Sequence, residues 1–261
     1  FPTWCATEWE KLFKDNFDES FIHDQSNQKI WEAVYDIPDE EIWNTRLKLK
    51  TKLIDYIKRK CSKDWLRSQI DPSLTISIFE KFNPNALLIG FGRRFATYKR
   101  AHLLFTDIDR LAKIVNNPKY PVQIIWAGKP YPMDYSAIST FNSLVEESKF
   151  HKNMAVLTGY ELALSKLMKQ GSDLWLNNPR VPREASGTSG MTAAMNGSVN
   201  LSTDDGWIPE FTKNGVNGFV VPQADYENTS VYDQDNFDLQ NLYAALENEI
   251  LPTYYDRPDE W

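Results

Sequence analysis

Short apolar runs alternate with longer stretches of helical spacing from residue 85 onward. The apolar runs predict strands at 86–91, 122–127, 154–158, 173–176, 199–202 and 218–221. Between them, the spacing of apolar positions predicts helices at 100–116, 136–147, 160–170, 189–195 and 238–250. Strands of this length that alternate with helices indicate βαβ units. We therefore predict an α/β fold with a doubly wound parallel sheet.

The first part of the chain has a different pattern, because residues 7–70 are helical in character throughout. The stretch 6–13 is amphipathic, and 39–61 places apolar residues at mixed three- and four-residue spacing with charges between them. The basic run 58–60 lies where the C-terminus of a helix favours cations, so we expect it to be solvated. We predict that 1–82 is a helical extension packed on a main domain at 83–261, in one compact unit.

Composition narrows the class of partner. Of 261 residues, 42% are hydrophobic and 25% charged, as in ordinary globular proteins, and the formal net charge is −7. A net acidic chain argues against a nucleic-acid partner. The chain has two cysteines, Cys5 and Cys61, which imply no disulfide framework. It has no run of about 18 apolar residues that could cross a bilayer. We expect a cytoplasmic protein with no membrane partner.

The segment 184–197 carries the strongest candidate chemistry. Gly187 and Gly190 allow close approach of the backbone, and hydroxyls from Ser186, Thr188 and Ser189 lie between and beside them, directly before a helical pattern. Backbone N–H groups at the start of a helix can hold an anion. An ordinary capped helix start is the alternative reading of such a cluster. We interpret the segment as a phosphate-binding loop.

A second block, 90–101, adds a local basic cluster to an acidic chain. Arg93, Arg94, Lys99 and Arg100 follow the first predicted strand. Guanidinium and ammonium groups suit a small phosphate, whose oxygens they can bind in pairs or as point charges. The three histidines are scattered and form no group with Asp, Glu or Cys at metal-ligand spacing, so we assign them no role and predict no metal site.

The words EASGTSGM at 184–191 and MNG at 195–197, together with the block 90–101, resemble the active-site segments of the α-glucan phosphorylases, which act on glycogen, starch or maltodextrin. Further stretches are similar to landmarks of that family in the same order, at 126–129, 173–179, 205–207 and 251–257. The resemblance spans nearly the whole chain. It implies the Rossmann-like C-terminal half of a two-domain glycosyltransferase of the GT-B type.

The resemblance also implies roles for individual residues. The substrate phosphate would be bound by Arg94 and Lys99, the predicted catalytic residues. The groups that match ligands of a pyridoxal phosphate cofactor are Arg93, Tyr160, Thr188, Ser189, Gly190 and Trp4. The groups that match ligands of the glucosyl hydroxyls are Glu184, Ser186 and Gly187. Lys129 could be a supporting cation or a solvated loop residue.

Thr192 departs from the family pattern at one decisive position. The family has a lysine there, which forms a Schiff base with pyridoxal phosphate, and a threonine hydroxyl cannot form an imine. The resemblance therefore implies a cofactor that is held without a bond to Thr192, or no cofactor at all. A natural replacement and an engineered one both remain open at this point.

The resemblance implies transfer of glucose from an α-1,4-glucan to phosphate, giving glucose 1-phosphate. Glucan, phosphate and a missing N-terminal domain are the implied partners, and a homodimer of the full-length protein is compatible with the family. Two alternatives stay open: a glucosyltransferase that uses a nucleotide sugar, and a non-catalytic remnant that binds glucan or regulates another enzyme. We expect this piece alone to be inactive, because it supplies one wall of a two-domain cleft.

Overall fold

A six-stranded parallel sheet organises the main part of the molecule. The computed structural model describes residues 3–68, 80, 82–151 and 153–261. The strands lie in the order β3-β2-β1-β4-β5-β6. Their bounds are β1 (Leu87–Gly92), β2 (Val122–Ala127), β3 (Met154–Leu157), β4 (Leu174–Asn177), β5 (Val199–Thr203) and β6 (Phe219–Val221). The doubly wound fold is confirmed, and each predicted strand agrees within one residue at either end.

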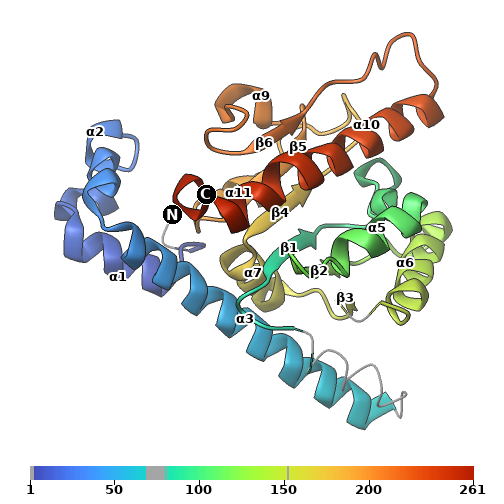
Figure 1. Ribbon diagram of the computed structural model, residues 1–261, viewed down its shortest axis with the longest axis horizontal. Helices are drawn as coiled ribbons and strands as arrows, with labels where there is room; N and C mark the ends of the chain where they lie inside the picture. The colour runs from blue at the N-terminus through green and yellow to red at the C-terminus, as the bar shows by residue number, and fades with distance from the viewer. Residues whose placement is uncertain (1–2, 69–79, 81, 152) are drawn as a thin grey trace.

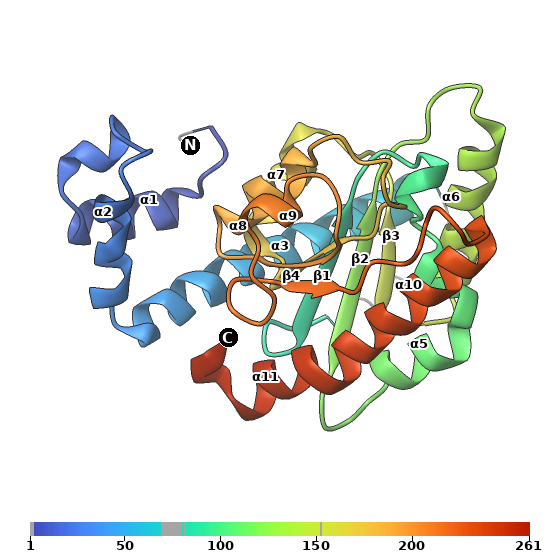
Figure 2. The same cartoon turned by 90° about the horizontal axis from the view of Figure 1, so that it is seen from above.

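Helices cover both faces of this sheet (Figure 2). One face carries α5 (Ile108–Val115), α6 (Tyr135–Ser148), α10 (Val231–Ala245) and α11 (Leu251–Asp256). The other carries α3 (Asp39–Ser68), α7 (Leu162–Gly171) and α8 (Thr188–Ala194). Alternate residues of β1 point to opposite cores, Ile89 to the first and Leu88 to the second. A strand buried on both faces must be apolar throughout, which explains the continuous apolar runs.

The N-terminal helices lie to one side of the sheet, and α3 runs from them across one face (Figure 1). The helices α1 (Thr7–Asn16) and α2 (Gln28–Trp31) enclose a separate small core of stacked and edge-on aromatic rings. The rings that contact one another in it are those of Phe13, Phe17, Phe21 and Trp31.

None of the helices in the described part of the chain has the length and apolar character needed to span a bilayer.

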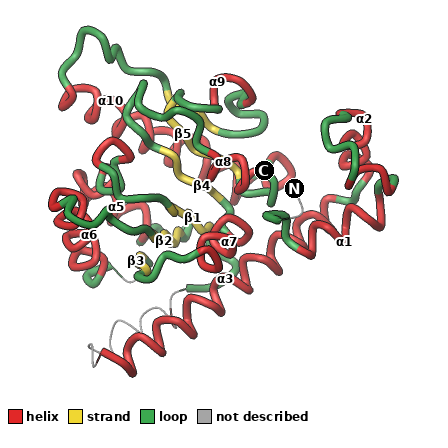
Figure 3. Tube along the Cα trace, turned by 180° about the vertical axis from the view of Figure 1, so that it is seen from behind, coloured by secondary structure: helices red, strands yellow, loops and turns green. Residues whose placement is uncertain are grey.

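Two helix predictions are wrong in their bounds, namely those for the segments that contain α5 and α10, which are labelled in Figure 3. The expected helix at 100–116 is replaced over its first half by a 3₁₀ turn, Leu103–Asp107, because Arg100 has a left-handed backbone with a φ of 50°. The expected helix at 238–250 begins earlier, at Val231, since the Ser230 hydroxyl caps it by accepting from the N–H of Asp233. It continues through a π-helical stretch, Leu246–Ile250.

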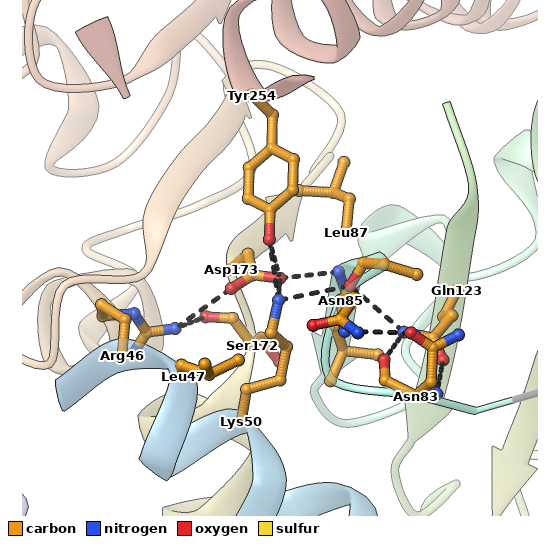
Figure 4. Close-up of polar contacts among 12 residues, drawn as sticks. Arg46, Leu47, Lys50, Asn83, Asn85, Leu87, Gln123, Ser172, Asp173 and Tyr254 are labelled. Carbon is orange, nitrogen blue, oxygen red and sulfur yellow. Dashed lines mark hydrogen bonds and ion pairs between the residues drawn. The ribbon is translucent and has the colours of Figure 1, made fainter. Parts of the chain in front are cut away.

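A buried group of charges joins α3 and α11 to the N-terminal ends of β1 and β4 (Figure 4). We call Arg46, Lys50, Asp173 and Tyr254 the base cluster. Lys50 Nζ donates to Asp173 Oδ2 at 2.8 Å and to the Tyr254 hydroxyl at 2.7 Å. Burial lowers the pKa of Lys50, and the carboxylate of Asp173 opposes that shift. The base cluster thus holds α3 against the sheet.

Candidate active site

The loops that follow β1 and β4 meet at the point where the strand order of the sheet reverses. In open parallel sheets this point, outside the carboxyl ends of the strands, is where ligands bind. The two loops are tied together, because Asn178 Nδ2 donates to the Arg100 carbonyl at 2.9 Å and Arg100 Nε donates to the Asn178 carbonyl at 2.9 Å. The backbone of Arg180 adds a bond to the Tyr98 carbonyl at 2.7 Å.

Three charged side chains from these loops converge. The Glu184 carboxylate accepts from Arg93 Nη2 at 3.0 Å and from Lys99 Nζ at 2.6 Å. All three side chains are at most 10% exposed. We call Arg93, Lys99 and Glu184 the site cluster. Sequence analysis placed them in one site but assigned them to three different ligands, so their direct pairing is new.

The site cluster has spare capacity for an anion. It holds two cations and one carboxylate, and Arg93 Nη1 is buried without a hydrogen-bond partner in the described part of the chain. Burial lowers the pKa of the Arg93 guanidinium, and Glu184 opposes that shift. An arginine stays charged even so. A buried, unpaired guanidinium nitrogen points to a missing acceptor, and the oxygens of phosphate and carboxylate groups are strong acceptors for guanidinium.

The loop 204–207 fixes the position of Glu184. The Asp205 carboxylate accepts from the backbone N–H of Glu184 at 2.8 Å and from that of Gly206 at 2.9 Å. The N–H of Trp207 donates to the Ser186 carbonyl at 2.9 Å. At Gly206, with a φ of +64°, an added Cβ would lie 2.4 Å from that same carbonyl. The sequence analysis gave these residues no supporting role. The resemblance of 205–207 to a landmark of the family was the signal that could have found it.

The predicted phosphate-binding loop leads into α8 as expected. Its two glycines have different roles in the structure. Gly187 precedes the helix with a φ of +87°, and the N–H groups of Thr188 and Ser189 have no acceptor among the described residues. Gly190 is a packing glycine, because an added Cβ would lie 2.8 Å from Asn200 Oδ1. Its expected contact with a cofactor stays a prediction.

Thr192 and Tyr160 are engaged within the protein. The Thr192 hydroxyl donates to the carbonyls of Thr188 at 3.1 Å and Ser189 at 3.0 Å, inside its own helix. The Tyr160 hydroxyl donates to the carbonyl of Gly92 at 2.9 Å, at the end of β1. Burial raises the pKa of Tyr160, so its hydroxyl keeps its proton. Tyr160 therefore lies beside the site cluster, and the hydroxyl proton of Thr192 is used within α8.

Several predicted residues lie outside the cluster. Arg94 is exposed and makes no hydrogen bond or ion pair with the residues that the structure describes. Ser186 and Lys129 are also exposed. Trp4 lies beside the C-terminal end of α8, where its carbonyl accepts from Asn196 Nδ2 at 3.0 Å. The roles of these residues in ligand binding stay predictions.

Comparison with known proteins gives a consistent result. The carbohydrate phosphorylase family model matches residues 3–216. A glycogen phosphorylase from Aquifex aeolicus is 39% identical over 99% of this chain and 37% of its own length. A maltodextrin phosphorylase from Thermococcus litoralis is 43% identical over 99% of this chain and 31% of its own length. The chain thus spans about a third of the length of these relatives. It belongs to the carbohydrate phosphorylase family.

Proposed function

We propose that the full-length protein containing this chain is an α-glucan phosphorylase. It would move the terminal glucosyl unit of an α-1,4-glucan onto inorganic phosphate and release glucose 1-phosphate. The observation that carries the proposal is the site cluster, in which the buried Arg93 keeps one nitrogen without an acceptor in the described part of the chain. The names of the relatives, glycogen and maltodextrin phosphorylases, support the same reaction.

Each side chain has a task that suits its chemistry. Lys99 and Arg94 would bind the substrate phosphate, whose negative charge they offset during transfer. Glu184 would accept hydrogen bonds from two adjacent sugar hydroxyls, because a carboxylate carries acceptors on both oxygens. Lys99 already donates to both oxygens of Glu184, at 2.9 and 2.6 Å. This pairing would hold the carboxylate in place and link the sugar site to the phosphate site.

The residues present fit the phosphate of pyridoxal phosphate. Arg93 Nη1 and the N–H groups of Thr188 and Ser189 are donors without acceptors among the described residues. Tyr160 and Trp4 would border the ring. When bound, the cofactor supplies a phosphate group that exchanges a proton with the substrate phosphate. Thr192 would contribute no bond to it, because a threonine hydroxyl cannot form an imine.

The remaining two thirds of such a protein would supply the facing wall of the cleft. The site cluster lies beyond the carboxyl ends of β1 and β4, on loops that would form one wall of the cleft. We propose that an N-terminal domain covers it, and that without this domain the chain binds glucan poorly and does not turn it over.

The test is phosphorolysis by the full-length protein, with maltoheptaose and inorganic phosphate, in the presence and absence of added pyridoxal phosphate. We expect glucose 1-phosphate, and more of it with the cofactor. No product under either condition would refute the proposal. Turnover of ADP-glucose or UDP-glucose without phosphate would instead support the nucleotide-sugar alternative.

Arg94→Ala sharpens the test. We expect a loss of phosphate-dependent turnover of about a hundredfold or more, because a cation that would offset charge on the transferred group is removed. Arg59→Ala, which removes an exposed arginine of α3, is the matched control and should leave turnover unchanged. Equal rates for the two variants would remove Arg94 from the site.

A further inference from the structure

One carboxylate outside the site cluster binds arginines from both of the loops that meet there. Asp235 lies near the N-terminal end of α10. Its Oδ1 accepts from Arg100 Nη1 at 2.8 Å and from Arg180 Nε at 3.0 Å, and its Oδ2 accepts from Arg180 Nη2 at 2.6 Å. Arg100 belongs to the loop after β1, and Arg180 belongs to the loop after β4. A single side chain of α10 therefore contacts both loops.

The two arginines need a counter-charge that they can share. The Arg100 side chain is fully buried, and that of Arg180 is 16% exposed. Two cations that donate to the same oxygen repel each other when no negative charge lies between them, and burial strengthens this repulsion. Burial also opposes the ionisation of Asp235, but hydrogen bonds from Arg180 and Arg100 outweigh it and lower the pKa of this carboxyl. Asp235 is therefore charged at neutral pH and allows the two loops to approach each other.

The same two loops carry the residues that would bind the substrates. Lys99 directly precedes Arg100, and its Nζ donates to Glu184 Oε2 at 2.6 Å. Arg180 opens the turn that leads to Glu184, since its carbonyl accepts from the N–H three residues later at 2.9 Å. The contacts thus form a closed ring. It runs from Asp235 through one arginine to Lys99, across to Glu184, and back through the other arginine to Asp235.

The neighbouring contacts show what Asp235 adds. The hydrogen bonds described above already join the two loops, but their acceptors are carbonyl groups, which carry no net charge. Asp238 lies one turn further along α10, and its carboxylate forms an ion pair with Arg100 Nη2 at 2.7 Å. Among the residues that the structure describes, Asp238 pairs with no second cation. Of these two acids, only Asp235 contacts both arginines.

We propose that Asp235 is a positioning residue for glucosyl transfer, because it sets the spacing between the phosphate site at Lys99 and the sugar site at Glu184. This inference rests on the proposed function, which assigns the two ligands. Each ligand would be bound mainly by one loop, so the binding of either ligand alone depends little on how the loops are spaced. Transfer requires both ligands in a fixed geometry, and a displacement of about 1 Å can slow a reaction a hundredfold. Loss of this carboxylate therefore acts on kcat rather than on KM.

The experiment measures phosphorolysis of maltoheptaose by the full-length protein with added pyridoxal phosphate, and the thermal unfolding of each variant. Asp235→Asn removes the charge at nearly constant size. We expect kcat to fall about tenfold or more, while the KM values for phosphate and for maltoheptaose change by less than about threefold. Asp238→Asn is the matched control, because it removes a carboxylate from the same helix and from the same Arg100. Its kcat should stay within about twofold of the unaltered value, even where its melting temperature falls.

Arg180→Lys tests the same contact from the other side and does not depend on the folding of Asp235→Asn. A lysine keeps the charge but cannot bind both oxygens of Asp235 as a fork, so kcat should again fall, by a smaller factor. An unchanged kcat in Arg180→Lys, or equal kcat values for Asp235→Asn and Asp238→Asn, would overturn the positioning role and leave the proposed function intact. A rise in KM at constant kcat would do the same. The absence of phosphorolysis by the unaltered protein would overturn both proposals.

Discussion

The two buried charge clusters lie at opposite ends of the same sheet and differ in how completely they are paired. In the base cluster, the Asp173 carboxylate accepts from Lys50 and from the backbone N–H of Leu88. None of its side chains has a buried polar atom without a partner in the described part of the chain. In the site cluster, Arg93 has such an atom, Nη1.

This difference separates a structural cluster from a binding one. Both clusters bury two cations around one carboxylate, so neither burial nor the number of charges distinguishes them. Buried donors that lack an acceptor distinguish the two clusters, because leaving such donors unpaired costs free energy that a ligand can recover. The base cluster is closed by the fold, whereas the site cluster needs a further acceptor.

The largest effect on stability is expected from Asp173→Asn. Removing the carboxylate charge leaves Lys50 and Arg46 buried without a counter-charge, which should lower the free energy of unfolding by about 3–5 kcal/mol. Urea denaturation measures this, with Asp55→Asn, an exposed carboxylate on α3, as the control. A loss below about 1 kcal/mol would mean that the cluster is not structural.

A smaller loss is expected from Glu184→Gln, about 2 kcal/mol, because the side chain of Glu184 is 10% exposed and that of Asp173 is 5% exposed. Added phosphate should restore much of this stability, since an anion between Arg93 and Lys99 replaces the lost charge and binds only the folded state. Thermal unfolding in phosphate and in chloride at equal ionic strength measures the effect. Glu210→Gln, on the surface of α9 (Ile208–Phe211), is the control. An equal response to phosphate in the two variants would contradict the comparison.

The sequence predicted the sheet well because buried parallel strands leave a strong signal. Continuous apolar runs marked all six strands, and their alternation with helices predicted the doubly wound parallel sheet. Helix boundaries were predicted less well, because the start of α10 at Val231 depends on a serine cap within a polar stretch. The turn at Arg100 depends on tertiary ion pairs to Asp235 and Asp238, which no local pattern reveals.

Within the site, the sequence predicted which loops meet but not how their charges pair. Motifs placed Arg93, Lys99 and Glu184 in one region, yet pairing depends on side-chain geometry between residues that are 85 and 91 positions apart in the chain. The burial of Lys169, outside the site cluster, was not predicted for a different reason. It sits at a helix end, where a lysine is ordinarily solvated, and only the packing of Trp4 against it shows that it is buried.

The smallest effect, and the only gain, is expected from Lys169→Met. Partial burial of the charged amine, which lies 4.3 Å from the centre of the Trp4 ring, destabilises the fold. The substitution should add about 1 kcal/mol, less than the pKa shift alone would give because the contact with the Trp4 ring is partly lost. The folded pKa of about 8 lies below the unfolded value. The unfolded state therefore binds the additional proton between these two values, and the unaltered protein becomes more stable as pH rises through that window. The advantage of the variant should be full below pH 8 and shrink toward about pH 10.5. Urea titrations across this range measure it. A pH-independent difference would show that Lys169 is ordinarily solvated, and a net loss of stability would show that its contacts are structural.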